Sequence, residues 1–274
     1  MKILAIDGMN FLHRARSGFT AGDHAVTYNV MRGLRALVEQ HAPTRVYFIL
    51  EGHPQARYDL MPTYKSNRIV EAGTPKHEEN KKFFRQVDEI IDLLSLRFPI
   101  SVVRHPDYEC DDTIFNLIKN SSSAAEWIVA STDTDFIQLL NEFPNVKLYN
   151  TITKEFVTTP SYDYVVWKSL RGDGSDCIPG IKGIGDKKAL EIVNDPDKLI
   201  ELFDSAEIGE QFARNHQLIK FMSWSGIDAV KMTSSFPTRN WDLVAKSFSD
   251  WEFKSLLKEE TFKKFCDTFE SLWG

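Results

Sequence analysis

Short apolar runs alternate with amphipathic patterns over the first 150 residues of the chain. Residues 45–52 (RVYFILEG) are continuously apolar, which is typical of a strand buried on both faces of a parallel sheet. Similar runs predict further strands at 2–7, 100–104, 126–132, 146–150 and 155–159. Helical patterns lie between them, at 25–40, 78–96, 110–120 and 134–140. Because helices separate the strands, the pattern predicts an α/β fold with a mainly parallel sheet.

The pattern changes near residue 161. From there to residue 274 it is helical, interrupted by the glycine-rich stretch GSDCIPGIKGIGDKKALEI at 174–192. We therefore predict an α/β core at 1–160 and a helical region at 161–274. Residues 61–80 are polar and contain proline and glycine, which predicts a functional loop or a mobile segment.

Composition narrows the class of protein. Of the 274 residues, 42% are hydrophobic and 26% are charged, as in ordinary soluble domains. No apolar run is long enough to span a membrane, and the start of the chain lacks the pattern of a signal peptide. The three cysteines are widely spaced and form no CxxC pair, so neither a disulfide framework nor a structural zinc site is predicted. We expect a cytoplasmic protein.

Carboxylates follow four of the predicted strands, and two more lie in the glycine-rich turn. Any one of them alone is more often a turn residue or a helix cap than a ligand. Together they favour a cation site, because the carboxyl ends of parallel strands share one edge of the sheet, where ligands bind. The nine acids are Asp7, Glu51, Glu109, Asp111, Asp112, Asp133, Asp135, Asp173 and Asp176.

A site made only of carboxylates favours Mg²⁺, and the lack of histidine disfavours zinc. Its size is typical of two-metal phosphodiester chemistry, although phosphatases and kinases reach similar ends with other signatures. The net charge of −6 argues against a nucleic-acid partner at first sight. Removing these nine acids from 39 leaves 30 against 33 basic residues, so the rest of the surface is compatible with a polyanion.

Two segments offer phosphate contacts. In the glycine-rich turn, exposed backbone N–H groups and the lysines that follow would attract phosphates without reading bases; the alternative is an ordinary helix–turn–helix connection. Its residues are Gly180, Gly183, Gly185, Lys187 and Lys188. The second segment is RYDLMPTYKSNR, which offers Arg57, Tyr64, Lys65 and Arg68. Lys65 and Arg68 could meet one phosphate and Tyr64 could stack on a base; the alternative is a solvated surface.

The ordered motifs DGMNFLHRA, YKSNR, YECDDTI, STDTDFIQL and GDGSDCIPGIKGIGDKKA resemble the 5′-nuclease superfamily. That family includes flap endonucleases, phage 5′→3′ exonucleases and T-even phage-type ribonucleases H. The resemblance covers residues 1 to about 195. It implies a PIN-like fold with a helical arch at about 61–95 and a helix-hairpin-helix element at about 174–195.

The resemblance also implies roles for the acids. Asp7, Glu109 and Asp111 match ligands of a first metal, with Asp111 able to bridge both ions. Asp133, Asp135 and Asp173 match ligands of a second metal. Asp112 and Asp176 match further carboxylates of bacterial and phage members.

The basic and aromatic residues receive roles in the same way. Lys65 and Arg68 match the pair that contacts the scissile phosphate, and with Asp111 and Asp135 they make up the expected catalytic set. Tyr64 matches an aromatic that stacks on a terminal base, and Arg14, in the first motif, is expected to bind DNA. Residues 180–188 match the duplex-gripping hairpin, often with a K⁺ ion on its carbonyls.

Three positions depart from the family pattern. Glu51 replaces an aspartate, so its metal contact is expected to shift or to run through water. Cys177 replaces an asparagine in D-N-I-P-G, and Thr132 replaces a glycine in S-G-D-x-D. None of the three removes a matched metal ligand, so we expect an active enzyme.

The resemblance implies a Mg²⁺-dependent, structure-specific 5′-nuclease that uses two Mg²⁺, with Mn²⁺ as a substitute. Its expected substrates are DNA and RNA–DNA duplexes with 5′ ends or flaps, including RNA primers removed during DNA replication. We expect a monomer that does not associate with a membrane and that works in the host cytoplasm if it is phage-encoded. The expected protein partner is a single-stranded-DNA-binding protein. The alternatives are a noncatalytic branched-DNA-binding protein and a PIN-type single-strand ribonuclease.

Overall fold

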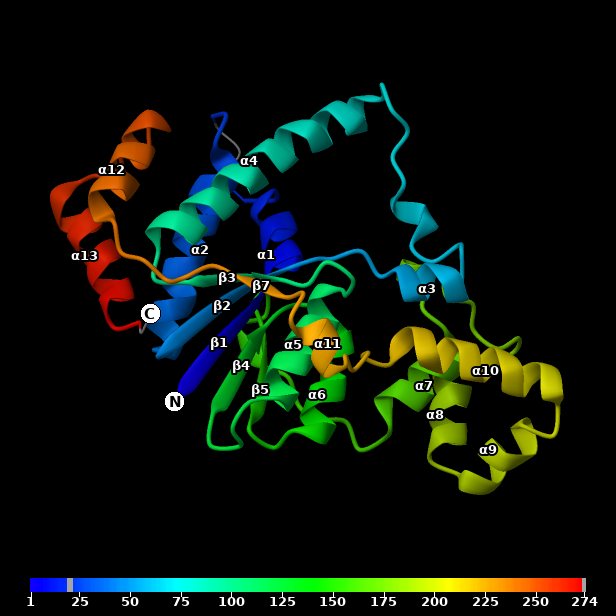
Figure 1. Ribbon diagram of the computed structural model, residues 1–274. Coiled ribbons are helices and arrows are strands. Elements are labelled where there is room, and N and C mark those ends of the chain that lie inside the picture. Colours follow the sequence, from blue (N-terminus) through cyan, green and yellow to red (C-terminus); the bar gives the residue numbers. More distant parts are fainter. Residues whose placement is uncertain (19–21, 273–274) are drawn as a thin grey trace.

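A computed structural model describes residues 1–18 and 22–272. Its centre is a seven-stranded sheet in the order β6-β5-β4-β1-β2-β3-β7 (Figure 1). The inner strands β5, β4, β1, β2 and β3 are all parallel, and two-residue strands pair antiparallel at both edges. The predicted mainly parallel α/β fold is confirmed. The strands are β1 (Lys2–Asp7), β2 (Arg45–Leu50), β3 (Ser101–Arg104), β4 (Glu126–Ala130), β5 (Val146–Asn150), β6 (Glu155–Phe156) and β7 (Thr233–Ser234).

Thirteen α-helices lie among the described residues, together with 3₁₀ turns η1 (Ser66–Arg68), η2 (Thr134–Phe136) and η3 (Gly174–Asp176). The sequence pattern had not indicated α1, α3 or β7. The helices are α1 (Gly8–Ala15), α2 (Ala25–His41), α3 (Gln55–Leu60), α4 (Pro75–Arg97), α5 (Cys110–Lys119), α6 (Ile137–Glu142), α7 (Tyr164–Arg171), α8 (Asp186–Val193), α9 (Pro196–Leu202), α10 (Ala206–Ile219), α11 (Gly226–Ala229), α12 (Trp241–Asp250) and α13 (Glu259–Glu270).

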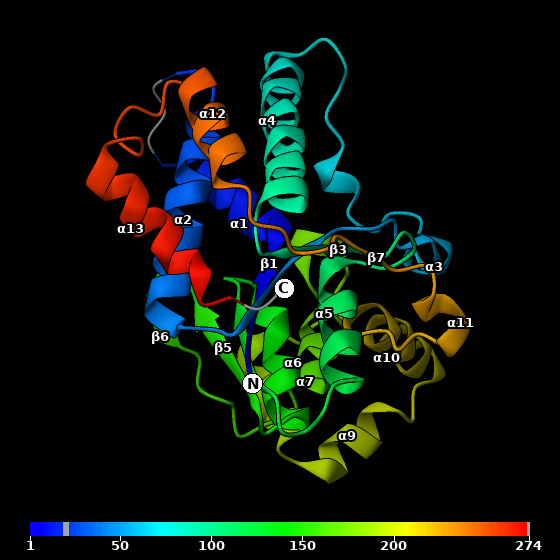
Figure 2. The same cartoon turned by 60° about the vertical axis from the view of Figure 1, so that its left-hand side comes forward.

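Helices cover both faces of the sheet. On one face, α1, α2, α4, α12 and α13 share a large apolar core that includes Leu34, Phe98, Phe248 and Phe269. On the other face, α5 and α6 pack against the strands. Figure 2 shows α12 and α13 beside α2 and α4, far along the chain from them. The sheet is therefore a platform with helices packed on both of its faces.

The helical region after residue 160 is divided between two sides of the sheet. Helices α7 to α10 form a cluster of their own on the α3 side, around Leu170, Ile181 and Ile184 (Figure 1). Helices α12 and α13 instead complete the core over α2 and α4. The division of the chain at residue 160 stays a prediction.

The predicted arch corresponds to the segment that leads from α3 through η1 into α4, which stands out from the sheet (Figures 1 and 2). The N-terminal half of α4 is held against the end of α1, because the His13 ring stacks on Phe83 and the Arg16 guanidinium lies over the same ring. Arg16 also pairs with Glu79 at 2.9 Å.

Among the described residues, no helix has the length and apolar character needed to cross a bilayer.

Candidate active site

The acids at the first two strand ends are held by the backbone around them. Asp7 ends β1 and caps α1, with one carboxylate oxygen accepting from the backbone N of Asn10 and the other from Ser131 Oγ at 2.7 Å. Glu51 follows β2 and accepts from the backbone N of Cys110 at 3.0 Å. A side chain at Gly8 would overlap the carbonyl oxygen of Ile49, so glycine lets the chain turn from β1 directly into α1.

The remaining acids also begin short helices or turns. Glu109 is the residue before α5, and Asp111 lies in its first turn. Asp133 caps η2, and Asp173 caps η3 by accepting from the backbone N of Ser175 at 2.8 Å. Short polar side chains favour these positions because they satisfy free N–H groups. The capping interpretation is therefore confirmed for Asp7, Asp133 and Asp173, whereas the ligand interpretation stays a prediction.

Eight of the nine predicted acids line one cavity of about 710 Å³. The expectation that separate strand ends bring them to one edge is confirmed. The acids include two groups of three, and within each group the ligand atoms all lie within 4.8 Å of one another. The first acid group is Glu109, Asp111 and Asp112, and the second is Asp135, Asp173 and Asp176. The cavity acids are Asp7, Glu51, Glu109, Asp111, Asp133, Asp135, Asp173 and Asp176.

The donor set fits hard divalent cations, because it offers carboxylate oxygens and neither histidine nor an accessible thiolate. Cys110, in the cavity wall, is buried, and burial raises the pKa of its thiol well above the usual value. Burial and the neighbouring Asp112 and Glu109 raise the pKa of Asp111 well above its ordinary value. Burial likewise raises the pKa of Asp7. A bound cation would reverse these shifts by favouring the ionised forms.

The buried carboxyl of Glu51 should make the stability of the metal-free protein depend on pH. Burial, and then repulsion from Glu109, raises its pKa to about 7 from 4.5. A carboxyl with a raised folded-state pKa is stabilising when protonated, and that contribution is lost as pH rises from its unfolded pKa to its folded pKa. In EDTA, we expect the unfolding free energy to fall by about 3 kcal/mol between pH 4.5 and 7 through Glu51 alone, at about 1.4 kcal/mol per pKa unit.

Urea denaturation at a series of pH values in EDTA measures this effect. Asp7 and Asp111 shift in the same direction, so they add to the fall. The Glu51→Gln variant should have a flatter profile than the native chain, and saturating Mg²⁺ should restore stability at pH 8. A Glu51→Gln profile as steep as that of the native chain would refute the assignment to this side chain.

Asp112 is the acid that does not line the cavity. It is fully buried; Arg57 donates to both of its carboxylate oxygens, and the backbone N of Met222 donates to one of them at 2.7 Å. Its carboxylate lies within the first acid group, but both of its oxygens already accept hydrogen bonds from Arg57, and one of them also accepts from the backbone N of Met222.

The predicted basic pair lies at the cavity. The Lys65 ammonium pairs with Glu109 and lies 3.7 Å from Asp176, and Arg68 pairs with Asp176 at 2.6 Å. Burial lowers the pKa of Lys65, but the Glu109 and Asp176 carboxylates outweigh burial and raise it overall, so the side chain stays cationic. Arg68 is more than half exposed, which leaves it accessible to a phosphate.

Tyr64 does not occupy the predicted position. The side chain is only 3% exposed, and its hydroxyl donates to Glu109 at 2.9 Å and to Asp176 at 3.3 Å. Its ring packs edge-to-face against the Tyr58 ring, with 5.8 Å between the ring centroids. In this structure the ring is therefore covered, and Tyr64 supports the acid group instead of presenting a face to a base.

Lys168 is a site residue that the sequence analysis missed. It is buried on α7, where its ammonium pairs with Asp135 and lies 2.7 Å from Asp173. The only sequence signal was its spacing of four from Tyr164, which puts the two on one helix face. Each of the two acid groups thus has a lysine in contact with it.

Arg14 lies beside an adjoining cavity of about 670 Å³, which shares Asp7, Glu51 and Lys65 with the acid cavity. Its guanidinium donates to the side chain and the carbonyl of Thr151. Thr132, in place of the family's glycine, shares hydrogen bonds with Asn10 next to this cavity.

The glycine-rich hairpin is a packed turn with an exposed polar face. Ile181 and Ile184 are buried, whereas Lys187 and Lys188 are exposed in the first turn of α8. Gly183 has a φ of 79°, which favours glycine. The two other glycines of the turn differ: Gly180 lies against the Arg171 carbonyl with no room for a side chain, and Gly185 precedes α8 in open space.

Cys177 adopts the left-handed conformation, with a φ of 61°. Asparagine is among the few residues that tolerate this region, so the family's asparagine has a backbone reason that cysteine does not share. The thiol lies 3.6 Å from Ser66 Oγ, at the contact between η3 and η1.

Known proteins resemble this chain in sequence. Residues 2–166 match the family described as 5′-3′ exonuclease, N-terminal resolvase-like domain. The chain is 28% identical to the 5′-3′ exonuclease of Bacillus subtilis over 229 residues, covering 76% of this chain and 74% of that protein. It is 26% identical to DNA polymerase I of Synechocystis over 234 residues, which is 74% of this chain but 23% of the polymerase.

Solved structures show the same fold. The T5 D15 protein co-crystallised with metal ions superposes with a TM-score of 0.65 over 99% of both chains, at 18% identity. The bacteriophage T5 D15 flap endonuclease in complex with DNA and metal ions superposes with a TM-score of 0.66. Because the family match spans residues 2–166, more than half of the chain, the chain belongs to the 5′-3′ exonuclease family.

Proposed function

We propose that this protein is a Mg²⁺-dependent, structure-specific 5′-nuclease that acts as an exonuclease and a flap endonuclease. The observation that carries the proposal is the acid cavity, in which carboxylates from separate strand ends face one space with Lys65 and Arg68. Binding alone would not require so many buried acids around one cavity, because burying ionised groups destabilises a fold. The noncatalytic alternative is disfavoured for this reason.

Each of the two proposed ligand sets shares two residues with one of the acid groups. Asp7, Glu109 and Asp111 would hold one ion, and Asp133, Asp135 and Asp173 the other. Glu51 and Asp176 lie close enough to contribute directly or through water. Bound Mg²⁺ would lower the pKa of a water and stabilise the charge of an in-line displacement.

The basic residues would position the phosphodiester. Lys65 reaches into the cavity from the base of the arch, and the more exposed Arg68 lies beside it. Both would orient the scissile phosphate and stabilise the charge that develops on its oxygens. Lys168, which holds Asp135 and Asp173, would orient those carboxylates. Mn²⁺ would substitute for Mg²⁺, since it prefers the same oxygen ligands.

The hairpin would grip the duplex. Lys187 and Lys188 are exposed at the start of α8, where they can contact phosphates without reading the bases. A K⁺ ion on the hairpin carbonyls is part of this proposal. Recognition of a duplex also distinguishes the protein from a PIN-type single-strand ribonuclease.

The proposed role is removal of RNA primers or 5′ flaps during DNA replication, with ribonuclease H activity on RNA–DNA duplexes. Support comes from relatives described as DNA polymerase I and from a similar fold bound to DNA. We further propose that the protein acts as a monomer in the cytoplasm, alongside a single-stranded-DNA-binding protein.

Cleavage of a 5′-labelled flap and of an RNA–DNA hybrid tests the proposal. The native chain should shorten both in Mg²⁺ and neither in EDTA. Asp135→Ala should lower the rate by roughly 10²-fold, as expected for loss of one electrostatic contributor, and should still bind the flap in a mobility-shift assay. Binding without cleavage by the native chain in Mg²⁺ and in Mn²⁺ would favour the noncatalytic alternative.

A further inference from the structure

Arg57, on α3, is among the largest fully buried side chains of the protein, yet it lines neither the acid cavity nor the adjoining one. Its guanidinium donates to Glu109 at 2.8 Å and to both oxygens of Asp112. On its other side, Nε donates to the carbonyl of Leu218 at 3.0 Å, at the end of α10. One planar cation thus joins the first acid group to a helix from the C-terminal region.

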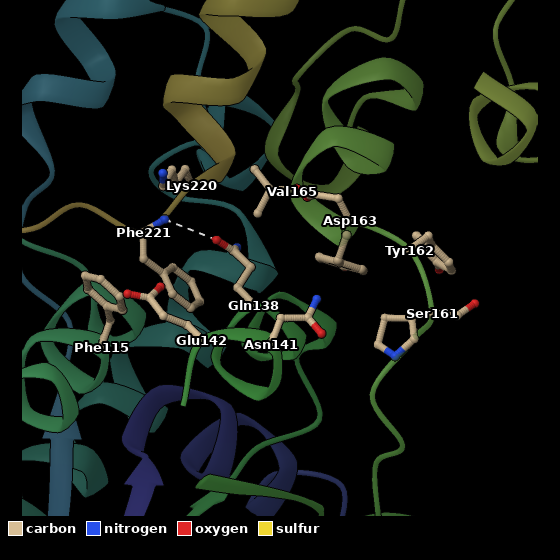
Figure 3. A pocket seen from close by; sticks show the side chains of 12 residues that line it. Phe115, Gln138, Asn141, Glu142, Ser161, Tyr162, Asp163, Val165, Lys220 and Phe221 are labelled. Atoms are coloured by element: carbon tan, nitrogen blue, oxygen red, sulfur yellow. Dashed lines mark hydrogen bonds between the residues drawn. The ribbon is translucent and has the colours of Figure 1, made fainter. Parts of the chain in front are cut away.

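The chain that follows α10 is held at this point from several directions. Asp112 accepts from the backbone N of Met222 at 2.7 Å. Gln138, on α6, accepts from the backbone N of Phe221 (Figure 3) and donates to the carbonyl of Ile219. The end of α10 is therefore fixed to α3, α5 and α6, close to Glu109.

The other turns of α10 contact the hairpin. Gln211 donates to the carbonyls of Pro179 at 3.2 Å and Gly180 at 3.1 Å. Asn215 donates to the carbonyl of Pro179 at 2.8 Å. A continuous series of hydrogen bonds and one helix therefore runs from the hairpin to Arg57 and on to Glu109.

We propose that Arg57 is a positioning residue that couples the hairpin's hold on a duplex to the acid cavity's hold on its metal ions. It does so by fixing Glu109 relative to the end of α10. This inference rests on the proposed function of the two sites. Arginine suits the task because its rigid fork can hold carboxylates on one edge while Nε serves a carbonyl, a geometry that lysine cannot reproduce.

Coupling of this kind is a thermodynamic quantity. If metal tightens flap binding by a given factor, the flap tightens metal binding by the same factor. A residue with only a structural role would change stability, or both affinities, without changing this factor. The factor is measured from flap affinity, by fluorescence anisotropy, in EDTA and in saturating Ca²⁺. Ca²⁺ affinity with and without the flap closes the cycle.

Two substitutions interrupt the series at opposite ends. Arg57→Lys keeps the buried charge and removes the fork. Gln211→Ala removes two of the three hydrogen bonds from α10 to the hairpin carbonyls, without touching any proposed metal ligand. For the native chain we expect Ca²⁺ to tighten flap binding tenfold or more. In both variants the factor should fall below threefold, while flap affinity in EDTA stays within threefold of the native value. Circular dichroism verifies that each variant is folded.

Arg35→Lys on α2, in a surface pair with Glu39, is the matched control and should keep the full factor. The inference is overturned if a folded Gln211→Ala or Arg57→Lys retains tenfold coupling, or if Arg35→Lys loses it. If Arg57→Lys does not fold, Gln211→Ala decides alone. A native chain that binds neither Mn²⁺ nor Ca²⁺ would instead refute the metal sites of the proposed function.

Discussion

Replacing Asp111 with asparagine is expected to abolish cleavage, lowering the rate at saturating Mg²⁺ by at least about 10⁴-fold. Asp111 lies at the first acid group, and its predicted role is to bridge both ions. Its loss would remove more than the 10²–10³-fold contribution of a single electrostatic group. Single-turnover cleavage of a 5′ flap, with protein in excess, measures the chemical step.

The same substitution should stabilise the metal-free protein. Burial and the neighbouring carboxylates make an ionised Asp111 unfavourable, and asparagine removes that charge at nearly constant volume. The melting temperature in EDTA at pH 8 should therefore rise while activity disappears. Asp107→Asn, in the loop before α5 and exposed in a pair with Lys231, is the control and should change neither quantity. Full activity of Asp111→Asn would remove Asp111 from the proposed chemistry.

Replacing Asp112 with alanine is expected to have the largest effect on stability, lowering the unfolding free energy by about 3–5 kcal/mol. Arg57 would keep its pair with Glu109 but lose both contacts with Asp112, and loss of a partner from a buried ion pair is strongly destabilising. Here the loss also leaves the backbone N of Met222 without its acceptor. Urea denaturation in EDTA, with metals absent, measures the effect separately from ion binding.

Two further variants define the cause. Asp112→Asn keeps an acceptor for Met222 and should lose less stability than Asp112→Ala. Asp107→Ala removes an exposed ion pair, for which a change under about 1 kcal/mol is expected. If Asp112→Ala lost no more than Asp107→Ala, the buried pair with Arg57 would not be a significant source of stability.

Much of the acid cavity could be predicted from the sequence because local patterns determine it. A strand is recognisable from its apolar run, and parallel strands must place their carboxyl ends at one edge. Asp7, Glu51 and Asp133 therefore meet in the structure as predicted. The same reasoning predicted the parallel sheet and most of the helices that connect its strands.

The residues that the prediction missed or misplaced are those whose roles depend on distant contacts. Arg57 meets acids more than fifty positions later, and Lys168 meets Asp135 from a helix that no periodicity ties to β4. Tyr64 was expected at an exposed face, but tertiary packing covers it against the acid group. Elements such as α3 and β7 are too short to give a periodic signal of their own.

The position of α12 and α13 affects how the chain folds during synthesis. Phe248 and Phe269 pack against Phe98 and the helices α2 and α4, which precede them by well over a hundred residues. Until α12 and α13 have been synthesised, the apolar surfaces of α2 and α4 that they cover stay exposed. Exposed surface of this kind is prone to aggregation. The core of the protein therefore closes only once α12 and α13 have been made, and chaperones are suited to protect the surfaces of α2 and α4 in the meantime.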